Sequence, residues 1–157
     1  MIFVNKKKSA YDIQAKLKTV GIEAKFLIGG LEQAERDHLI DEFRRELFPV
    51  LISTNVLARG IDVPQVDVVI NFDVPVIQNC GWLEPDYANY MHRVGRTGRF
   101  GTDGLALTFI SKDSENEPGF VDKIASNYAI EIEELKDFAS FEKAYNQMRN
   151  KNDGDTV

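Results

Sequence analysis

Two kinds of apolar segment alternate along the chain. Five short runs rich in β-branched and aromatic residues read almost without polar interruption, at positions 2–4, 25–28, 50–52, 66–72 and 105–110. Such runs are typical of parallel strands that helices cover on both faces. Longer segments with apolar residues at helical spacing lie between and after them, at positions 10–20, 39–47, 120–128 and 138–148.

This alternation favours an α/β domain with a mostly parallel sheet. With one more short run at Ile130 and Ile132, the pattern predicts about five to six strands and helices on both faces. We expect residues 1–149 to form this domain and residues 150–157, which lack an apolar anchor, to be a disordered tail. A strand that begins at residue 2 without a leading loop also suggests a piece of a longer chain.

Composition narrows the class of protein. The 157 residues are 43% hydrophobic and 28% charged, which suits one soluble globular domain. No apolar run approaches the roughly 18 residues of a membrane span, and no signal peptide is visible. The single cysteine, Cys80, excludes an intrachain disulfide and a cysteine zinc site, so a reducing compartment fits.

Charge is distributed unevenly, with a net value of −6 for the whole chain. Residues 1–111 hold 13 basic and 14 acidic side chains, whereas residues 112–157 hold 6 and 11. Bulk charge therefore argues against a protein that coats nucleic acid. The nearly neutral first part still leaves room for a local basic groove.

The most specific segment holds three arginines at steps of three, interrupted by two glycines: Arg93, Gly95, Arg96, Gly98 and Arg99. A solvated helix face could show the arginine spacing, but each glycine inside a helix costs about 1 kcal/mol relative to alanine. Arginine without lysine favours bidentate contact with phosphate oxygens. The spacing alone leaves both a phosphate site and a surface helix open.

Two further segments follow predicted strands. Thr54 and Asp62 lie just past the run at 50–52, where ligands bind in α/β sheets, although a capped turn would explain them equally well. Gly29 and Gly30 precede a predicted helix and could cradle a phosphate. They do not form a Walker A loop, and a plain turn remains the alternative.

Together, these segments resemble in order and spacing the second half of the DEAD-box RNA helicase core. The resemblance covers roughly residues 1–147, and its motif VI string is highly specific. The matching residues are Asn5 in motif IV, Gln33 and Arg36 in motif IVa, Thr54 and 58–62 in motif V, Asp67 and 71–73 in motif Va, and His92, Arg93, Gly95, Arg96 and Arg99 in motif VI.

Residues 76–86 form a longer linker between motifs Va and VI than most members have, similar to the mRNA-export helicase at the cytoplasmic face of the nuclear pore. Two departures are visible. Residues 28–30 read Ile-Gly-Gly where the family usually has His-Gly-Asp, and Phe72 stands where Tyr is common. The first departure makes the local RNA or partner contact uncertain.

The resemblance implies a RecA-like three-layer sandwich that is the second of two such domains. ATP with Mg²⁺ would be held mainly by the first domain, whose phosphate loop and DEAD residues this chain lacks, so the chain alone should hydrolyse nothing. Arg96 and Arg99 would be arginine fingers, and Gly60 and Asp62 would bind ATP. We expect the arginines to lie near the edge where Thr54 and Asp62 emerge. No metal site of the chain's own is expected.

The resemblance also assigns the remaining contacts. His92 and Arg93 would couple this domain to the first RecA-like domain. Gly30, Gln33, Arg36 and Thr54 would contact the phosphates and sugars of single-stranded RNA, without sequence preference.

Partners follow from the subfamily. A nuclear-pore activator with inositol hexakisphosphate would dock on this domain, in a protein of the cytoplasm and nucleus. The isolated domain should be a monomer without membrane contact. Two alternatives stay open: a DEAD-box helicase of translation or splicing, and a non-catalytic RecA-like module kept for protein binding.

Overall fold

The computed structural model describes residues 1–54, 66–98 and 102–154, and five of the strands in these ranges form one sheet. Their order is β2-β3-β1-β4-β7, and every pairing between neighbours is parallel. The strands are β1 (Ile2–Phe3), β2 (Ala24–Leu27), β3 (Val50–Ser53), β4 (Val68–Asn71) and β7 (Leu105–Thr108). All five coincide with runs that the sequence predicts as strands.

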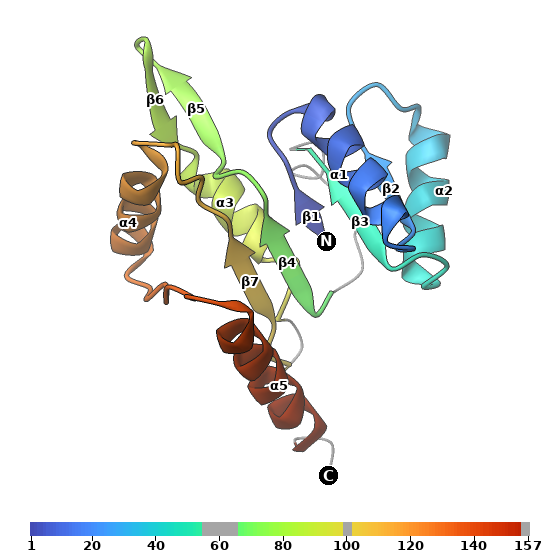
Figure 1. Cartoon of the computed structure of the whole chain (residues 1–157). Coiled ribbons are helices and arrows are strands. Elements are labelled where there is room, and N and C mark those ends of the chain that lie inside the picture. Colours follow the sequence, from blue (N-terminus) through green and yellow to red (C-terminus); the bar gives the residue numbers. More distant parts are fainter. Residues whose placement is uncertain (55–65, 99–101, 155–157) are drawn as a thin grey trace.

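Helices α1 and α2 cover opposite faces of the sheet. Successive strand residues alternate between two cores: Phe3 packs against α2, whereas Val4 packs against α1. The helices of the described ranges are α1 (Lys7–Thr19), α2 (Gln33–Arg44), α3 (Tyr87–Val94), α4 (Glu117–Tyr128) and α5 (Phe138–Gly154). The three-layer arrangement that the sequence predicts is therefore present around β1 and β3 (Figure 1).

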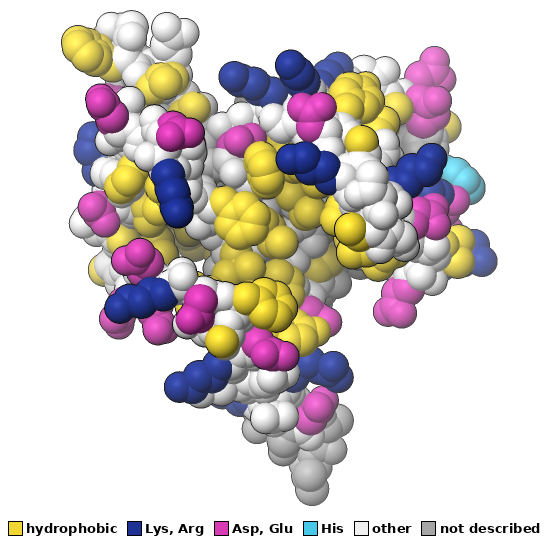
Figure 2. Space-filling view, viewed as in Figure 1, with side chains coloured by type: hydrophobic (Ala, Val, Ile, Leu, Met, Phe, Trp, Pro, Cys, Tyr) yellow, Lys and Arg dark blue, Asp and Glu magenta, His cyan; other side chains and the backbone are white. Residues whose placement is uncertain are grey.

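A third, smaller core joins α3 to α4. Tyr90 of α3 packs there with Phe120 and Ile124 of α4, beneath the loop that holds Val74. On the face seen in Figure 2, hydrophobic side chains gather over the region where Figure 1 places β4 and β7. Phe72 and Phe109 follow these two strands, are both exposed, and meet edge to face at 6.0 Å between ring centroids.

The linker at 76–86 forms an antiparallel hairpin that the apolar pattern does not predict. Its strands are β5 (Val76–Asn79) and β6 (Trp82–Pro85), and in Figure 1 it extends past the carboxyl ends of β4 and β7. The turn between them places Cys80 at φ 49° and Gly81 at φ 89°. Two consecutive positive φ angles are the geometry of a tight hairpin turn.

Two other expectations differ from the structure. The tail predicted at 150–157 is wrong for residues 150–154, because α5 continues to Gly154. The short strand expected around Ile130 and Ile132 is absent, since residues 130–136 form no regular element. In the part of the chain that the structure describes, no helix is long and apolar enough to cross a membrane.

Candidate functional site

The carboxyl ends of β1 and β4 are joined by Arg93, whose side chain points inward from α3. Only 1% of Arg93 is exposed. One guanidinium nitrogen donates to Asn5 Oδ1 at 2.8 Å and the other to the Asp73 carbonyl at 2.9 Å. The guanidinium also lies over the Phe3 ring, 5.4 Å from its centroid. Arg93 therefore connects a helix to the ends of two neighbouring strands.

Asn5 and Asp73, both half-buried, complete this network around the Arg93 guanidinium. The Asn5 N–H donates to Asp73 Oδ2 at 2.7 Å, and Asn5 Nδ2 donates to the Val74 carbonyl at 2.8 Å. Burial lowers the pKa of Arg93 to about 10, while the carboxylates of Asp73 and Asp86 act in the opposite direction. An arginine with that pKa still carries its proton at neutral pH.

The inward position of Arg93 conflicts with the direct interdomain contact expected from the resemblance. A side chain that is 1% exposed and bonded within its own domain has no surface to offer a second domain. His92, its neighbour on α3, is exposed, and its coupling role stays a prediction. The sequence placed Asn5 and Asp73 in motifs without giving either side chain a role. Their only signal was a polar residue directly after an apolar run.

Helix α3 runs from the carboxyl end of β4 to its amino end, and Arg96 lies at the latter. Asp86 caps the start of α3 by accepting the Asn89 N–H at 2.9 Å. At the far end, the Val66 N–H donates to the Arg96 carbonyl at 3.2 Å, just before β4 begins. Arg96 itself is partly buried, and its Nε donates to the His92 carbonyl at 3.2 Å.

The expectation that Arg96 lies near the edge where Thr54 emerges is therefore wrong. Thr54 follows the carboxyl end of β3, whereas Arg96 lies at the opposite end of the sheet. The sequence showed that both follow buried elements but not which way α3 points. The segment between Thr54 and Val66 connects these two ends and carries Gly60 and Asp62. Gly60, Asp62 and Arg99 lie outside the described residues.

Thr97 fixes the chain directly after Arg96. Its hydroxyl lies within hydrogen-bond distance of the carbonyls of Val66, at 2.6 Å, and Asp67, at 3.0 Å. Gly104 packs directly against Thr97. A Cβ on Gly104 would lie 1.9 Å from Thr97 Oγ1 and 2.4 Å from the Gly98 nitrogen. Only glycine fits there, so the two ends of the loop 98–104 meet at the amino end of β4.

The predicted RNA contacts gather at the carboxyl ends of β2 and β3. Thr54 is 9% exposed, and its N–H donates to the Leu27 carbonyl at 3.3 Å. Gln33 and Arg36 lie in the first turn of α2, where Gln33 donates to Asp37 Oδ1 at 2.8 Å. A capping box between Glu32 and Glu35 begins the helix.

The Ile-Gly-Gly departure has a structural explanation. Ile28 is buried against α1 in an apolar core. A histidine at this position would either place its polar ring in that core or turn out of it. Gly30 has a φ of 105°, a conformation that side chains rarely adopt. Lys7 lies beside it and donates from Nζ to the Gly29 carbonyl at 2.5 Å. The turn is therefore built for glycine and presents a lysine in place of the usual carboxylate.

No group of three or more His, Cys, Asp or Glu side chains that could hold a metal ion occurs among the described residues. A family model described as the helicase conserved C-terminal domain matches residues 1–101. The chain belongs to this family.

Relatives of this helicase domain are DEAD-box proteins. The ATP-dependent RNA helicase DBP5 of Saccharomyces cerevisiae is 51% identical over 117 residues, which are 74% of this chain and 24% of that protein. The solved C-terminal domain of the DEAD-box protein Dbp5 matches with a TM-score of 0.81 at 42% identity, over 93% of this chain and 80% of that chain. S. cerevisiae Dbp5 bound to RNA and ADP BeF3 matches equally well, over 94% of this chain and 37% of that chain.

This helicase domain spans about a quarter of the length of the curated relatives it matches. The comparisons confirm the resemblance to the second half of a DEAD-box core and the RecA-like fold predicted from it. They leave the roles of individual site residues as predictions.

Proposed function

We propose that this chain is the second motor domain of an ATP-dependent DEAD-box RNA helicase that remodels RNA during mRNA export. The observation that carries the proposal is the contact between Arg96 and Val66. It joins the end of the motif VI helix to Val66, which follows the motif V segment in the chain. A domain kept only for protein binding would have no need to retain Arg96, Arg99 and Asp62 together.

Arg96 and Arg99 act as arginine fingers in this proposal. ATP with Mg²⁺ is held mainly by a first RecA-like domain, and Gly60 and Asp62 complete its binding from this side. Guanidiniums stabilise the charge on the transferring phosphoryl group, an effect worth roughly 10³–10⁵ in rate in related enzymes. Hydrolysis then depends on closure of the two domains, because the fingers reach the phosphates only in the closed state.

RNA is bound along the carboxyl ends of β2 and β3. Gly30, Gln33, Arg36 and Thr54 contact phosphates and sugars there, which position the strand without reading its sequence. Lys7 supports this assignment, because its ammonium adds positive charge beside Gly30. Contacts to 2′-hydroxyls favour single-stranded RNA over DNA.

The partners follow from the relatives. One solved S. cerevisiae Dbp5 is bound to RNA and ADP BeF3, another to Gle1 and IP6, and a third to Nup159, Gle1, IP6 and ADP. We propose an activator of the same kind, with inositol hexakisphosphate, for this chain. The full protein then acts in the cytoplasm and nucleus and at the cytoplasmic face of the nuclear pore. These names favour export over translation or splicing.

ATPase measurements on the full-length protein test the catalytic proposal. Arg96→Ala and Arg99→Ala should each lower RNA-stimulated turnover by about 10³ or more, while ATP binding falls much less. Arg96→Lys should not restore turnover, because the planar guanidinium and not charge alone is needed. Arg149→Ala, an exposed arginine on α5, is the matched control. Near-normal turnover of the Arg96→Ala or Arg99→Ala enzyme would refute the arginine-finger role.

A further inference from the structure

The predicted RNA contacts lie at one level of the sheet. Strands β2, β3 and β1 are neighbours, and Leu27, Ser53 and Phe3 are partners in register, so the three strands end together. Gly30 and Thr54 follow the ends of β2 and β3. An RNA strand along Gly30 and Thr54 therefore lies beside the carboxyl end of β1, the next strand of the sheet.

The chain that leaves β1 carries three consecutive exposed lysines, Lys6, Lys7 and Lys8. Helix α1 begins here without a side-chain cap and without an acidic residue in its first turn. Positive charge at this end of a helix is unfavourable, because the backbone N–H groups there are already electropositive. The lysines therefore do not stabilise α1, which favours a role toward a ligand. Figure 2 shows Lys and Arg side chains gathered along the edge where Figure 1 places the start of α1.

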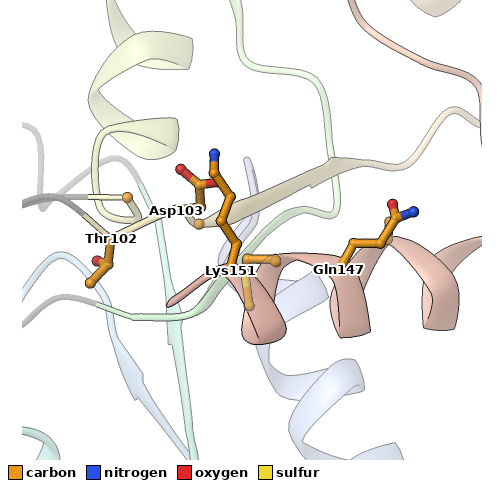
Figure 3. Close-up of a pocket in the computed structure, with 8 residues that line it drawn as sticks. Thr102, Asp103, Gln147 and Lys151 are labelled. Atoms are coloured by element: carbon orange, nitrogen blue, oxygen red, sulfur yellow. The ribbon is translucent and has the colours of Figure 1, made fainter. Parts of the chain in front are cut away.

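Lys7 reaches from α1 to the turn at Gly30. Its Nζ donates to the Gly29 carbonyl at 2.5 Å, and a Cβ on Gly30 would lie 3.8 Å from that Nζ. Within the part of the chain that the structure describes, no carboxylate lies within 4 Å of Lys7 Nζ. Lys151 on α5 provides the contrast, because its ammonium meets the carboxylate of Asp103 (Figure 3). The positive charge of Lys7 is thus not offset by a neighbouring carboxylate.

The residue at position 30 decides whether Lys7 has a carboxylate partner. DEAD-box helicases usually have Asp where this chain has Gly30. A side chain that begins 3.8 Å from the ammonium would bring an aspartate carboxylate within ion-pair distance of it. Gly30 leaves the ammonium for another anion. The anion that an RNA strand brings to this edge is a phosphate, which lysine binds as a compact point charge.

We propose that Lys7 binds a backbone phosphate of single-stranded RNA, and that glycine at position 30 leaves it free to do so. This inference rests on the proposed function and deepens it. The RNA site of this chain makes one more phosphate contact than a site in which Asp at position 30 pairs with the lysine. RNA binding should therefore depend more steeply on salt, because each phosphate contact releases counterions.

The salt dependence of RNA binding by the full-length protein tests the contact. Fluorescence anisotropy of a labelled oligouridine gives the affinity with ADP BeF3 present, at about 50 to 300 mM KCl. Lys7→Gln removes the charge but keeps a donor for the Gly29 carbonyl. It should lower the steepness of log affinity against log salt by about 0.7 and weaken binding by about 3- to 10-fold at about 0.1 M salt. Lys7→Arg should keep the slope, because it keeps the charge.

Lys18→Gln is the matched control. Lys18 is an exposed lysine near the other end of α1, and its substitution changes the net charge of the protein by the same amount. The slope of this variant should equal that of the unsubstituted protein. If Lys7→Gln gave the slope of the control, Lys7 would bind no phosphate. An acidic protein partner at Lys7 would produce that result, and the proposal would be overturned.

Gly30→Asp tests the contribution of the glycine. Its carboxylate should pair with Lys7 and lower the slope as Lys7→Gln does. Gly30→Asn carries the same backbone strain at φ 105° without the charge and should keep the slope. In a protein that already carries Lys7→Gln, Gly30→Asp should change the slope little further. An unchanged slope for Gly30→Asp in the otherwise unsubstituted protein would overturn the role given to Gly30.

The outcomes separate this inference from the proposed function. If the unsubstituted protein binds RNA but RNA does not stimulate its ATPase, the helicase function fails, and the slopes still decide the role of Lys7. If RNA stimulates the ATPase and the slope of Lys7→Gln equals that of the control, only the role of Lys7 fails. Absence of RNA binding by the unsubstituted protein at every salt concentration would overturn both.

Discussion

The two ends of β4 are held in different ways. At the carboxyl end, the buried Arg93 side chain forms hydrogen bonds with the half-buried Asn5 and Asp73. At the amino end, the Thr97 hydroxyl anchors the chain, and Asp103 is held by exposed contacts from Asn152 and Lys151. The exposed contacts of Asp103 therefore contribute less free energy than the contacts of the buried Arg93.

This difference follows from solvent access. A hydrogen bond lost in the interior leaves donors and acceptors without partners, and each such group costs about 1–3 kcal/mol. A bond lost at the surface is replaced by water, and an exposed ion pair contributes only about 0–1 kcal/mol. Burial therefore separates two residues of motif VI: Arg93 is part of the interior of the domain, whereas Arg96 is only partly buried.

The largest effect is expected for Arg93→Ala. It leaves Asn5 Oδ1 and the Asp73 carbonyl without their donor and opens a cavity over Phe3, so the free energy of unfolding should fall by about 3–5 kcal/mol. Urea denaturation measures this loss. Arg149→Ala, at an exposed site, should change stability by less than about 0.5 kcal/mol. Equal stability of the two variants would show that the carboxyl end is not the rigid one.

The difference in the free energy of unfolding between the unsubstituted chain and Arg93→Ala has a defined pH dependence. The pKa of Arg93 in the folded state, about 10, lies below its ordinary value because the side chain is buried. The unfolded chain therefore binds this proton more tightly, and the contribution of Arg93 to stability rises with pH only above about 10. The stability difference between the unsubstituted chain and Arg93→Ala should stay constant from about pH 6 to pH 9. A slope in that range would indicate a different titrating group.

Gly104→Ala tests the base of the loop at the amino end. Its Cβ would lie 1.9 Å from Thr97 Oγ1 and 2.4 Å from backbone, so the loop must shift and release the Thr97 hydroxyl. We expect a loss of about 2 kcal/mol, within the range for overpacking. Gly119→Ala is the matched control, because nothing lies within 4 Å of its Cβ in the first turn of α4. The control should be neutral or stabilising by up to about 1 kcal/mol, and a similar result for Gly104→Ala would contradict the tight contact.

The sequence predicts the five parallel strands, because each coincides with a short apolar run, and the central strand β3 is buried on both faces. It does not predict the interior of the site. Arg93 donates a hydrogen bond to Asn5, which lies 88 residues earlier in the chain, and no local sequence pattern predicts that contact. Residues 151 and 152 lack apolar anchors and read as a tail, yet they bind Asp103. In both places, polar partners distant in sequence override the local pattern.

The hairpin at 76–85 shows a different limit. Its turn needs two positive φ angles, and cysteine, unlike Asn, Asp or Gly, is not a residue from which a positive φ is predicted. The length of the linker indicates the subfamily but does not indicate the hairpin. Likewise, motif VI predicted arginines that face a nucleotide. It could not predict the direction of α3, which separates Arg96 from Thr54.

The smallest effect is expected where the chain departs from its family, at Gly30. Gly30→Ala should lower the free energy of unfolding by about 1 kcal/mol, because φ 105° disfavours any side chain although the space around it is open. Gly30→Asp restores the family's usual residue and places a carboxylate near Lys7 Nζ, which lies 3.8 Å from the added Cβ. An exposed ion pair of this kind recovers at most about 0.5 kcal/mol. The free energy of unfolding should therefore fall slightly less for Gly30→Asp than for Gly30→Ala. Urea denaturation of the unsubstituted chain, Gly30→Ala and Gly30→Asp measures the order of their free energies of unfolding. If the Gly30→Asp variant proved more stable than the unsubstituted chain, the ion pair with Lys7 would outweigh the backbone strain at this turn.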